Sequence, residues 1–260
     1  MMDQITSIHN PKIKHLLQLQ QKSSARRKEG LFVVEGQREL EHCLAAGYEV
    51  VETYRVGENV SEKVYEHIAY RGTTEGVIAV VRAKPHTLID IAKDDVSRSP
   101  LYIVLEGVEK PGNLGAILRS ADASGVDAVI VCDPLTDIYN PNIIRGSIGA
   151  VFTVPTVVCS SEECIGFMKE HGVQILTAQL QDSSLYYDQD MTRPTAIVMG
   201  TEATGLTNQW REAADAHIRI PMLGRLDSLN VSVSAAILMY EAVRQRGGKK
   251  YIKTDRELCR

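Results

Sequence analysis

Apolar residues recur along the chain with two different periods, helical in some stretches and strand-like in others. In residues 11–21, Ile13, Leu16 and Leu17 stand at helical spacing, and Pro11 suits the first turn of a helix. Two further helices and three strands are predicted nearby, at residues 37–46, 61–69, 31–34, 48–54 and 77–81. Residues 1–82 are therefore expected to form a small α/β domain.

A polar stretch with two prolines follows at residues 83–100 and is interpreted as a linker. Beyond it, apolar runs of strand length occur at residues 101–105, 127–132, 150–158, 173–178, 195–199 and 217–220. Helical stretches separate several of these runs, which predicts a mostly parallel sheet covered on both faces. The last helix is expected at residues 228–246, with a buried stripe of Val231, Ala235, Leu238, Met239 and Ala242. Residues 101–260 are thus expected to form a second, larger α/β domain.

Composition narrows the class of protein. The 260 residues are 44% hydrophobic and 24% charged, which is typical of a globular protein with a proper core. No run approaches the roughly 18 apolar residues of a membrane span, and the N-terminus lacks the apolar core of a signal peptide. Five scattered cysteines argue against a secreted disulfide framework. We therefore expect a cytoplasmic protein.

Basic residues gather at both ends of the chain, although the formal net charge is −4. Residues 1–30 carry six Lys or Arg against two Asp or Glu, and residues 244–260 carry seven against two. Clustered basic side chains suit contact with a phosphate backbone. A pair of solvated chain ends would explain the same charges equally well.

Common catalytic signatures are missing from the sequence. It contains no GxxxxGK[ST] phosphate loop, no GxSxG elbow, no HExxH zinc motif and no GxGxxG dinucleotide fingerprint. Cys159 and Cys164 stand apart from matching His or Cys pairs and are interpreted as ordinary thiols. A metal-free protein that is not a nicotinamide-dependent dehydrogenase is expected.

Three unusual segments each follow a predicted strand, where open α/β sheets bind ligands. The first, EGVEKPGNLGAILRSA at residues 106–121, places Asn113 where it can cap a helix and Arg119 less than two turns later. Both side chains could then reach one cleft above the sheet. Taken alone, a Gly-rich turn followed by a solvated arginine is common.

The second and third segments have the same location relative to their strands. In GTEATGLT at residues 200–207, Glu202 lies between two glycines, although it could simply favour the positive end of the next helix. In IPMLGRLDSLNVSVS at residues 220–234, small polar residues crowd the start of the last helix, namely Ser228, Asn230, Ser232 and Ser234. Four such residues exceed what capping requires and create a hydrogen-bonding surface at a positive helix end.

Together the three segments resemble the motifs of the SpoU/TrmH branch of the SPOUT methyltransferases. The shared patterns are N-x-G-x-x-x-R, G-x-E-x-x-G-L and I-P-M-x-G-x-x-x-S-L-N-V-S, and they occur in this order within residues 101–248. Residues 24–36, SARRKEGLFVVEG, are similar to the substrate-binding domain attached to many members that act on ribosomal RNA. Lys110, before Pro111, departs from the acidic or neutral residue that relatives often carry and could alter RNA preference.

The resemblance implies a fold and a cofactor. Members of this family transfer the methyl group of S-adenosylmethionine (AdoMet) to a ribose 2′-hydroxyl. Their catalytic domain is a parallel α/β sheet tied in a trefoil knot, which here would involve residues 195–248. The cofactor would sit in the knot, held mainly by backbone groups around Met199, Gly200, Ile220 and Leu229.

The resemblance also implies catalytic roles. It assigns a base-like role to Arg119. Because arginine is effectively always protonated, we interpret Arg119 as orienting the ribose oxygen and its phosphate, and as stabilising charge while the proton leaves. Asn113, Glu202, Ser228 and Asn230 are expected to fix Arg119 and the substrate through hydrogen bonds.

The partners expected from the resemblance are RNA and a second copy of the chain. Candidate phosphate contacts are Lys22, Arg26, Arg27, Lys28 and Arg145. The N-terminal domain favours ribosomal RNA, in particular that of the large subunit, over transfer RNA. A non-catalytic RNA-binding or ribosome-assembly protein of the same fold is the remaining alternative, against which the intact motif residues argue. Family members are homodimers, so a dimer is expected.

Overall fold

A computed structural model of the chain describes residues 4–70, 76–92, 99–201 and 204–247. Two compact units are built from segments that alternate along the chain. Unit 1 comprises Met1–Pro85, Lys110–Gly115 and Thr136–Thr153. Unit 2 comprises His86–Glu109, Ala116–Leu135 and Val154–Arg260. The expected division into functional domains at residues 82 and 100 stays a prediction.

Unit 1 contains an antiparallel three-stranded sheet with the order β1-β3-β2. Its strands are β1 (Leu31–Glu35), β2 (Val50–Arg55) and β3 (Val77–Arg82). Its helices are α1 (Pro11–Gln21), α2 (Ser23–Glu29), α3 (Gln37–Ala45), α4 (Glu62–Ile68), α7 (Pro141–Ser147) and α8 (Ala150–Thr153). The predicted α1 is confirmed. Ile13, Leu16 and Leu19 lie in the core, whereas Leu17 packs at its edge.

The strand predicted at residues 150–158 is wrong in its first half. Residues 150–153 form α8, and only Thr156–Cys159 form a strand, β6. The apolar run misleads because Phe152 is buried by aromatic packing rather than by strand pairing. Its ring lies 5.9 Å from that of Phe32 and 5.2 Å from that of Tyr48. Tertiary packing overrides the strand propensity of the run.

Unit 2 contains the predicted parallel sheet, seven strands with the order β6-β5-β4-β9-β7-β10-β8. Besides β6, these strands are β4 (Leu101–Glu106), β5 (Ala128–Cys132), β7 (Gln174–Ala178), β8 (Ser184–Leu185), β9 (Thr195–Met199) and β10 (Ala216–Arg219). Every residue of β4, β5 and β9 is buried, as expected for strands covered on both faces. Paired strands in this sheet all run parallel, which confirms the prediction.

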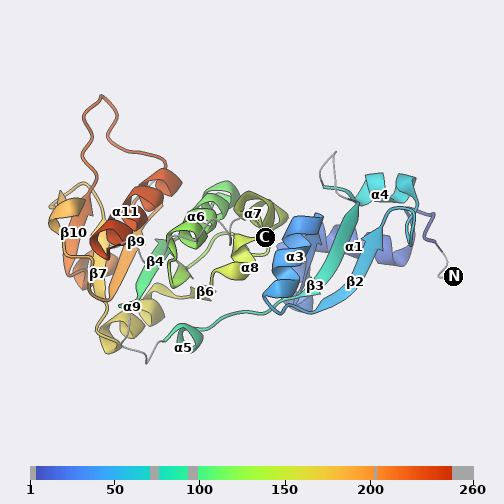
Figure 1. The fold of residues 1–260 in the computed structure, drawn as a ribbon, viewed down its shortest axis with the longest axis horizontal. Coiled ribbons are helices and arrows are strands. Elements are labelled where there is room, and N and C mark those ends of the chain that lie inside the picture. Colours follow the sequence, from blue (N-terminus) through green and yellow to red (C-terminus); the bar gives the residue numbers. More distant parts are fainter. Residues whose placement is uncertain (1–3, 71–75, 93–98, 202–203, 248–260) are drawn as a thin grey trace. The chain divides into compact units, whose positions relative to one another are not determined.

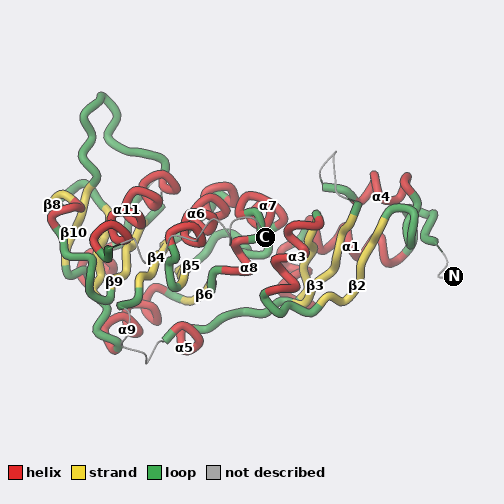
Figure 2. The backbone as a smooth tube through the Cα atoms, viewed as in Figure 1, coloured by secondary structure: helices red, strands yellow, loops and turns green. Residues whose placement is uncertain are grey.

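Helices cover both faces of this sheet (Figures 1 and 2). They are α5 (Leu88–Ile91), α6 (Pro111–Ser124), α9 (Ser161–Glu170), α10 (Asn208–Ala213) and α11 (Val231–Gln245), with a short 3-10 turn at Tyr186–Asp188. On one face, Phe167 of α9 and Trp210 of α10 pack in a core with Tyr102 and Val104 of β4. Helix α6 contacts α11 through the Ser124 hydroxyl, which donates to the Met239 sulfur at 3.4 Å.

The strand order brings two of the unusual segments together. Strands β4 and β9 are neighbours, with Leu105 opposite Met199 at their carboxyl ends. The segments that begin at Glu106 and Gly200 therefore leave the sheet at the same edge. Strand β10, which precedes the third segment, lies two positions from β9 in the sheet. It pairs with β7, the strand between them.

Helix α11 begins later than predicted. It starts at Val231 rather than Ser228, so residues 220–230 form an irregular connection that extends from β10 (Figures 1 and 2). Ala235, Leu238, Met239 and Ala242 are buried as expected, whereas Val231 is half-buried. No helix within the described residues is both long enough and apolar enough to cross a membrane. The trefoil knot stays a prediction.

Candidate functional site

The carboxyl end of β4 is fixed to the segment that follows β9. Glu106 is buried, and its carboxylate accepts hydrogen bonds from Thr207 N at 2.9 Å and Thr207 Oγ1 at 2.6 Å. Thr207 immediately precedes α10, so this contact closes the loop that starts at Gly200. Sequence reasoning missed Glu106. Its signal was an acidic residue at the end of an otherwise apolar strand, which requires a partner when buried.

Position 200 requires a glycine because the backbone of the loop that follows it lies very close to this residue. The amide of Thr201 donates to Gly205 O at 3.2 Å, and Gly205 N donates to Thr201 O at 3.0 Å. A Cβ atom on Gly200 would lie 2.2 Å from the carbonyl carbon of Gly205, closer than real Cβ contacts allow. Gly205 itself has a φ of 68°, a left-handed conformation that favours glycine. Glu202 lies outside the described residues.

Helix α6 carries the two predicted side chains of the first segment. It begins at Pro111, and Lys110 O accepts from Asn113 N at 3.1 Å and Leu114 N at 3.3 Å. The prediction that Asn113 caps the helix is therefore wrong, because Asn113 lies within the first turn. Arg119 is exposed and lies six residues further along the same helix.

The third segment ends in a helix cap. The Asn230 side chain accepts a hydrogen bond from Ser232 N at 2.9 Å and another from Ser232 Oγ at 2.6 Å. Asn230 therefore carries out the capping role that its residue type favours. This cap fixes the start of α11 at Val231, and Ser228 and Leu229 lie just before the cap.

A cavity of about 150 Å³ opens at the carboxyl ends of β7 and β10. Ile220, Ser228 and Leu229 of the third segment all line it, together with Ser234 and Leu238 of α11. The structure thus brings two of the four predicted cofactor residues to one cavity. In the described part of the chain, Met199, Gly200, Asn113 and Arg119 are not among the residues that line this cavity.

Gln179, which sequence reasoning missed, also lines the cavity. Its side-chain nitrogen donates to Gln181 O at 2.9 Å, so the side-chain oxygen, Oε1, points away from Gln181 O. Oε1 is buried, and no described group lies within hydrogen-bonding distance of it. A buried acceptor without a partner is costly unless a ligand supplies a donor. The sequence alone does not indicate Gln179, because this residue reaches the cavity only through the pairing of β7 with β10.

The cavity suits an adenosyl group. Its walls combine apolar side chains such as Ile218, Met222 and Leu238 with a small number of polar groups, the pattern of small-molecule sites. An adenine amine or a ribose hydroxyl bound beside Gln179 would supply the donor that Oε1 lacks once the amide turns toward the cavity. The residues present therefore fit AdoMet, the cofactor that the sequence motifs imply.

The predicted basic RNA contacts all belong to unit 1, and one of them is wrong. Lys22, Arg27 and Lys28 are exposed. Arg26 is only 5% exposed, because its guanidinium forms an ion pair with Asp137 at 2.6 Å and donates to two carbonyl groups at the end of α1. Arg26 therefore holds α1 and α2 together and is not available to a phosphate.

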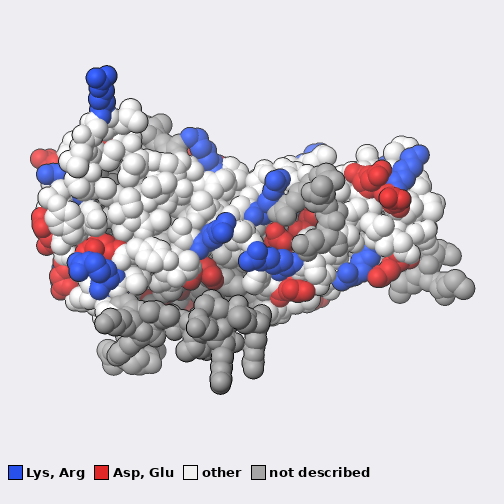
Figure 3. All heavy atoms as spheres, turned by 45° about the horizontal axis from the view of Figure 1, so that its top comes forward, with Lys and Arg blue, Asp and Glu red and all other residues white. Residues whose placement is uncertain are grey.

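Arg145 is exposed at the end of α7 and lines a small hollow in unit 1 together with Glu35 and Tyr70. On the face seen in Figure 3, Lys and Arg side chains are interspersed with Asp and Glu. Most of the basic residues at the C-terminal end of the chain lie outside the described residues, which end at residue 247.

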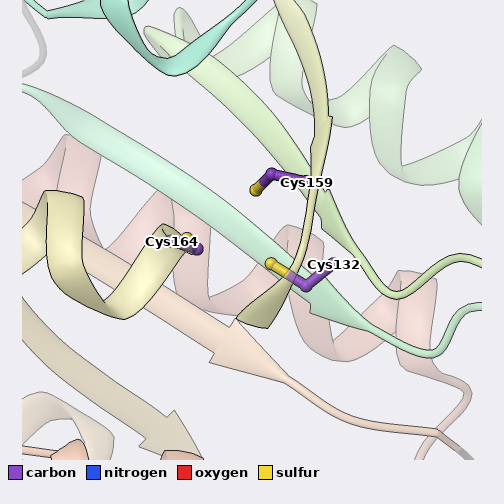
Figure 4. A group of neighbouring side chains, drawn as sticks. All are labelled: Cys132, Cys159 and Cys164. Carbon is purple, nitrogen blue, oxygen red and sulfur yellow. The ribbon is translucent and has the colours of Figure 1, made fainter. Parts of the chain in front are cut away.

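Three cysteines from different elements meet in unit 2. The sulfur atoms of Cys132, Cys159 and Cys164 all lie within 4.8 Å of one another (Figure 4). Hydrogen bonds from the Cys132 thiol, and next from that of Cys164, hold the pKa of Cys159 well below its usual value. The expectation that Cys159 and Cys164 stand apart from other cysteines is therefore wrong, and their interpretation as ordinary thiols stays a prediction.

Comparison with known proteins finds relatives for both parts of the chain. The SpoU rRNA Methylase family matches residues 100–240, and the MRM3-like substrate binding domain matches residues 10–59. A 23S rRNA (guanosine-2'-O-)-methyltransferase, RlmB, from Bordetella pertussis is 40% identical over 181 residues, which are 68% of this chain and 74% of that protein. Matched segments span from 58% to 78% of the lengths of such curated relatives.

Solved structures resemble the chain over nearly its whole length. A crystal structure of an RNA 2'-O ribose methyltransferase has a TM-score of 0.79 and 39% identity, and the match covers 94% of this chain and 99% of that one. An AdoMet-bound rRNA methyltransferase from Sinorhizobium meliloti has a TM-score of 0.86 and 28% identity, with 94% and 98% covered. These likenesses confirm the predicted α/β fold class.

Proposed function

Because the chain belongs to the SpoU rRNA methylase family, we propose that it transfers the methyl group of AdoMet to a ribose 2′-hydroxyl of ribosomal RNA, with large-subunit RNA as the favoured substrate. The observation that carries this proposal is the cavity beside β7 and β10. There the third sequence motif supplies Ile220, Ser228 and Leu229, beside Gln179, whose buried Oε1 lacks a partner among the described residues.

Cofactor binding is proposed to rest on the shape of this cavity. Ile220 and Leu229 would contact the adenosyl group, and Gln179 Oε1 would accept one of its hydrogen bonds. Met199 and Gly200 remain proposed contacts at the end of β9, a strand that pairs with β7. When bound, the cofactor supplies a methyl group activated by its sulfonium sulfur.

Catalysis is proposed to depend mainly on positioning the acceptor hydroxyl. Arg119 would hold the ribose oxygen and its phosphate, and would stabilise negative charge as the proton leaves. Its helix contacts α11, the helix that follows Ser228 and Asn230. Asn113 and Glu202 would complete the set of hydrogen bonds around Arg119 and the substrate.

Residues 1–82 are proposed to bind the RNA as a substrate-binding domain, with residues 83–100 as a linker and residues 101–260 as the catalytic domain. The match of residues 10–59 to the MRM3-like substrate binding domain supports this division. Lys22, Arg27, Lys28 and Arg145 are exposed and would contact phosphates. Ribosomal RNA as the substrate implies a cytoplasmic location, which is part of the proposal.

A homodimer through the catalytic domain is also proposed. The connection between β10 and α11 exposes Leu223 by 98% and Leu226 by 75%, and α11 exposes Val233 and Tyr240. Apolar side chains exposed together mark interaction surfaces. The proposal predicts that Leu223→Asp together with Leu226→Asp converts a dimer into a monomer in light scattering, whereas a wild-type monomer would contradict it.

The activity is tested with purified protein, methyl-labelled AdoMet and unmodified transcripts of large-subunit ribosomal RNA and of transfer RNA. We expect label in the large-subunit transcript, recovered after nuclease digestion as a 2′-O-methylated nucleoside. A transcript with 2′-deoxyribose at the modified position should accept none. Label confined to transfer RNA would overturn the substrate assignment. AdoMet binding without transfer to either RNA or to assembled ribosomal particles would favour the non-catalytic alternative.

A further inference from the structure

Three cysteine side chains converge at the carboxyl edge of the large sheet (Figure 4). Cys132 is the last residue of β5, Cys159 is the last residue of β6, and Cys164 lies in the first turns of α9. Cys132 and Cys159 are register partners in neighbouring parallel strands. We refer to these three residues as the thiol cluster. No residue of the thiol cluster takes part in the function proposed above.

The geometry of the thiol cluster is close to that of a metal site. Its sulfur atoms lie within 4.8 Å of one another. An ion bound at about 2.3 Å from each of three sulfurs requires sulfur–sulfur separations of about 4 Å. The required adjustment is less than about 1 Å per pair, which small side-chain rotations can supply.

The backbone around the thiol cluster is rigidly held. Asp133 N donates to Cys159 O at 3.1 Å, which ties the residue after Cys132 to the end of β6. The Asp133 carboxylate accepts hydrogen bonds from Ser161 N at 3.1 Å and Ser161 Oγ at 2.7 Å. Trp210 Nε1 donates to Ser161 Oγ at 2.9 Å. These contacts fix the ends of β5 and β6 and the start of α9, the backbone from which the three cysteines project.

Burial and access also suit a bound ion. Cys132 and Cys164 are fully buried, whereas Cys159 is half-buried. Three protein ligands leave the fourth position of a tetrahedral shell to a solvent molecule. Three thiolates without carboxylate or imidazole ligands select soft ions rather than Mg²⁺ or Ca²⁺.

The geometry points to a binding site for a thiophilic closed-shell metal ion, Zn²⁺ or Cu⁺, held by Cys132, Cys159 and Cys164. Each thiol releases its proton to solvent on binding, and no change of oxidation state is involved. The ion would join the ends of β5 and β6 to the start of α9. This site is independent of the proposed methyl transfer.

The test uses the 260-residue chain with Cys259→Ser, because Cys259 lies outside the described residues and would compete for the metal. The protein is reduced under anaerobic conditions and titrated with Co²⁺ as a spectroscopic probe. We expect a thiolate-to-cobalt charge-transfer band that saturates at one ion per chain and is displaced by Zn²⁺. A parallel titration with Cu⁺ against a competing chelator distinguishes the two ions, and tighter binding of either one supports the site.

Variants assign the band to the thiol cluster. Cys159→Ser removes the half-buried ligand with the least disturbance of the core and should weaken Co²⁺ and Zn²⁺ binding by about 100-fold or more. Losing even a residue that only hydrogen-bonds to a ligand weakens binding by about 10–100-fold. Cys159→His should retain binding with an altered spectrum. The matched control is Cys43→Ala, which removes a buried cysteine of α3 in unit 1 and should leave binding unchanged.

X-ray absorption of the Zn²⁺-loaded protein should count three sulfur ligands at about 2.3 Å. Equal affinities of the parent and Cys159→Ser proteins would overturn the proposal, as would the failure of the reduced parent to bind Co²⁺, Zn²⁺ and Cu⁺. These measurements do not use methyl transfer, so they can fail while the proposed function stands.

Discussion

Replacing Gly200 by alanine tests whether the loop after β9 has the tight conformation described here. The new Cβ would meet three backbone atoms, at 2.2 Å from Gly205 C, 2.3 Å from Gly205 O and 2.5 Å from Leu206 N. Ordinary contact begins at 3.4 Å, so the backbone must move by about 1 Å or more. Overpacking of this kind lowers the free energy of unfolding by about 1–3 kcal/mol. The displaced loop carries the second motif and should also bind AdoMet less tightly.

The measurements are differential scanning calorimetry and calorimetric titration with AdoMet. At about 2–4 °C per kcal/mol for a chain of this size, unfolding of Gly200→Ala should occur about 2–12 °C below that of the parent. Gly166→Ala in α9, outside the proposed cofactor cavity, is the matched control, because nothing lies within 4 Å of a Cβ at this position and the residue is exposed. If both variants unfold at the same temperature and bind AdoMet equally, the described loop geometry is wrong.

Three further predictions concern the proposed reaction. Arg119→Ala should reduce methyl transfer by at least about 100-fold while AdoMet affinity, measured by calorimetry, changes little; unchanged turnover would exclude its role. Gln179→Ala should weaken AdoMet binding by about 1 kcal/mol, or about fivefold, because one ligand hydrogen bond is lost, and an unchanged affinity would remove Gln179 from the cofactor site. Replacing Lys22, Arg27 and Lys28 together by alanine should weaken RNA binding and reduce the slope of log affinity against log salt by about 2–3, whereas an unaltered slope would place the RNA surface elsewhere.

Local pattern predicted many elements of the fold correctly. Helix α1 and strand β9 have the predicted boundaries, because an amphipathic stripe and an uninterrupted buried strand leave clear signals. Helix α2 was missed, since its residues are mostly polar and its stability depends on the buried Arg26 and on Gly30, which ends the helix at a φ of 64°. The start of α11 was misplaced by three residues because four small polar residues competed as caps.

The candidate site was predictable to the extent that it follows the strand ends. Ile220, Ser228 and Leu229 meet at the cavity because one short segment contains all three. Gln179 could not be found from spacing, since it reaches the cavity only through the pairing of β7 with β10. The thiol cluster was missed for the same reason. The pairing of β5 with β6 brings together Cys132 and Cys159, which are 27 residues apart. The placement of α9 adds Cys164, five residues after Cys159.

We propose that this chain methylates a ribose in ribosomal RNA. The most direct measurement is a map of ribose 2′-O-methylation across the ribosomal and transfer RNA of cells that contain the protein, lack it, or carry Arg119→Ala in its place. We predict a 2′-O-methyl group in large-subunit RNA that is present only with the unaltered protein and absent in the other two strains. Identical maps from all three strains would contradict the account.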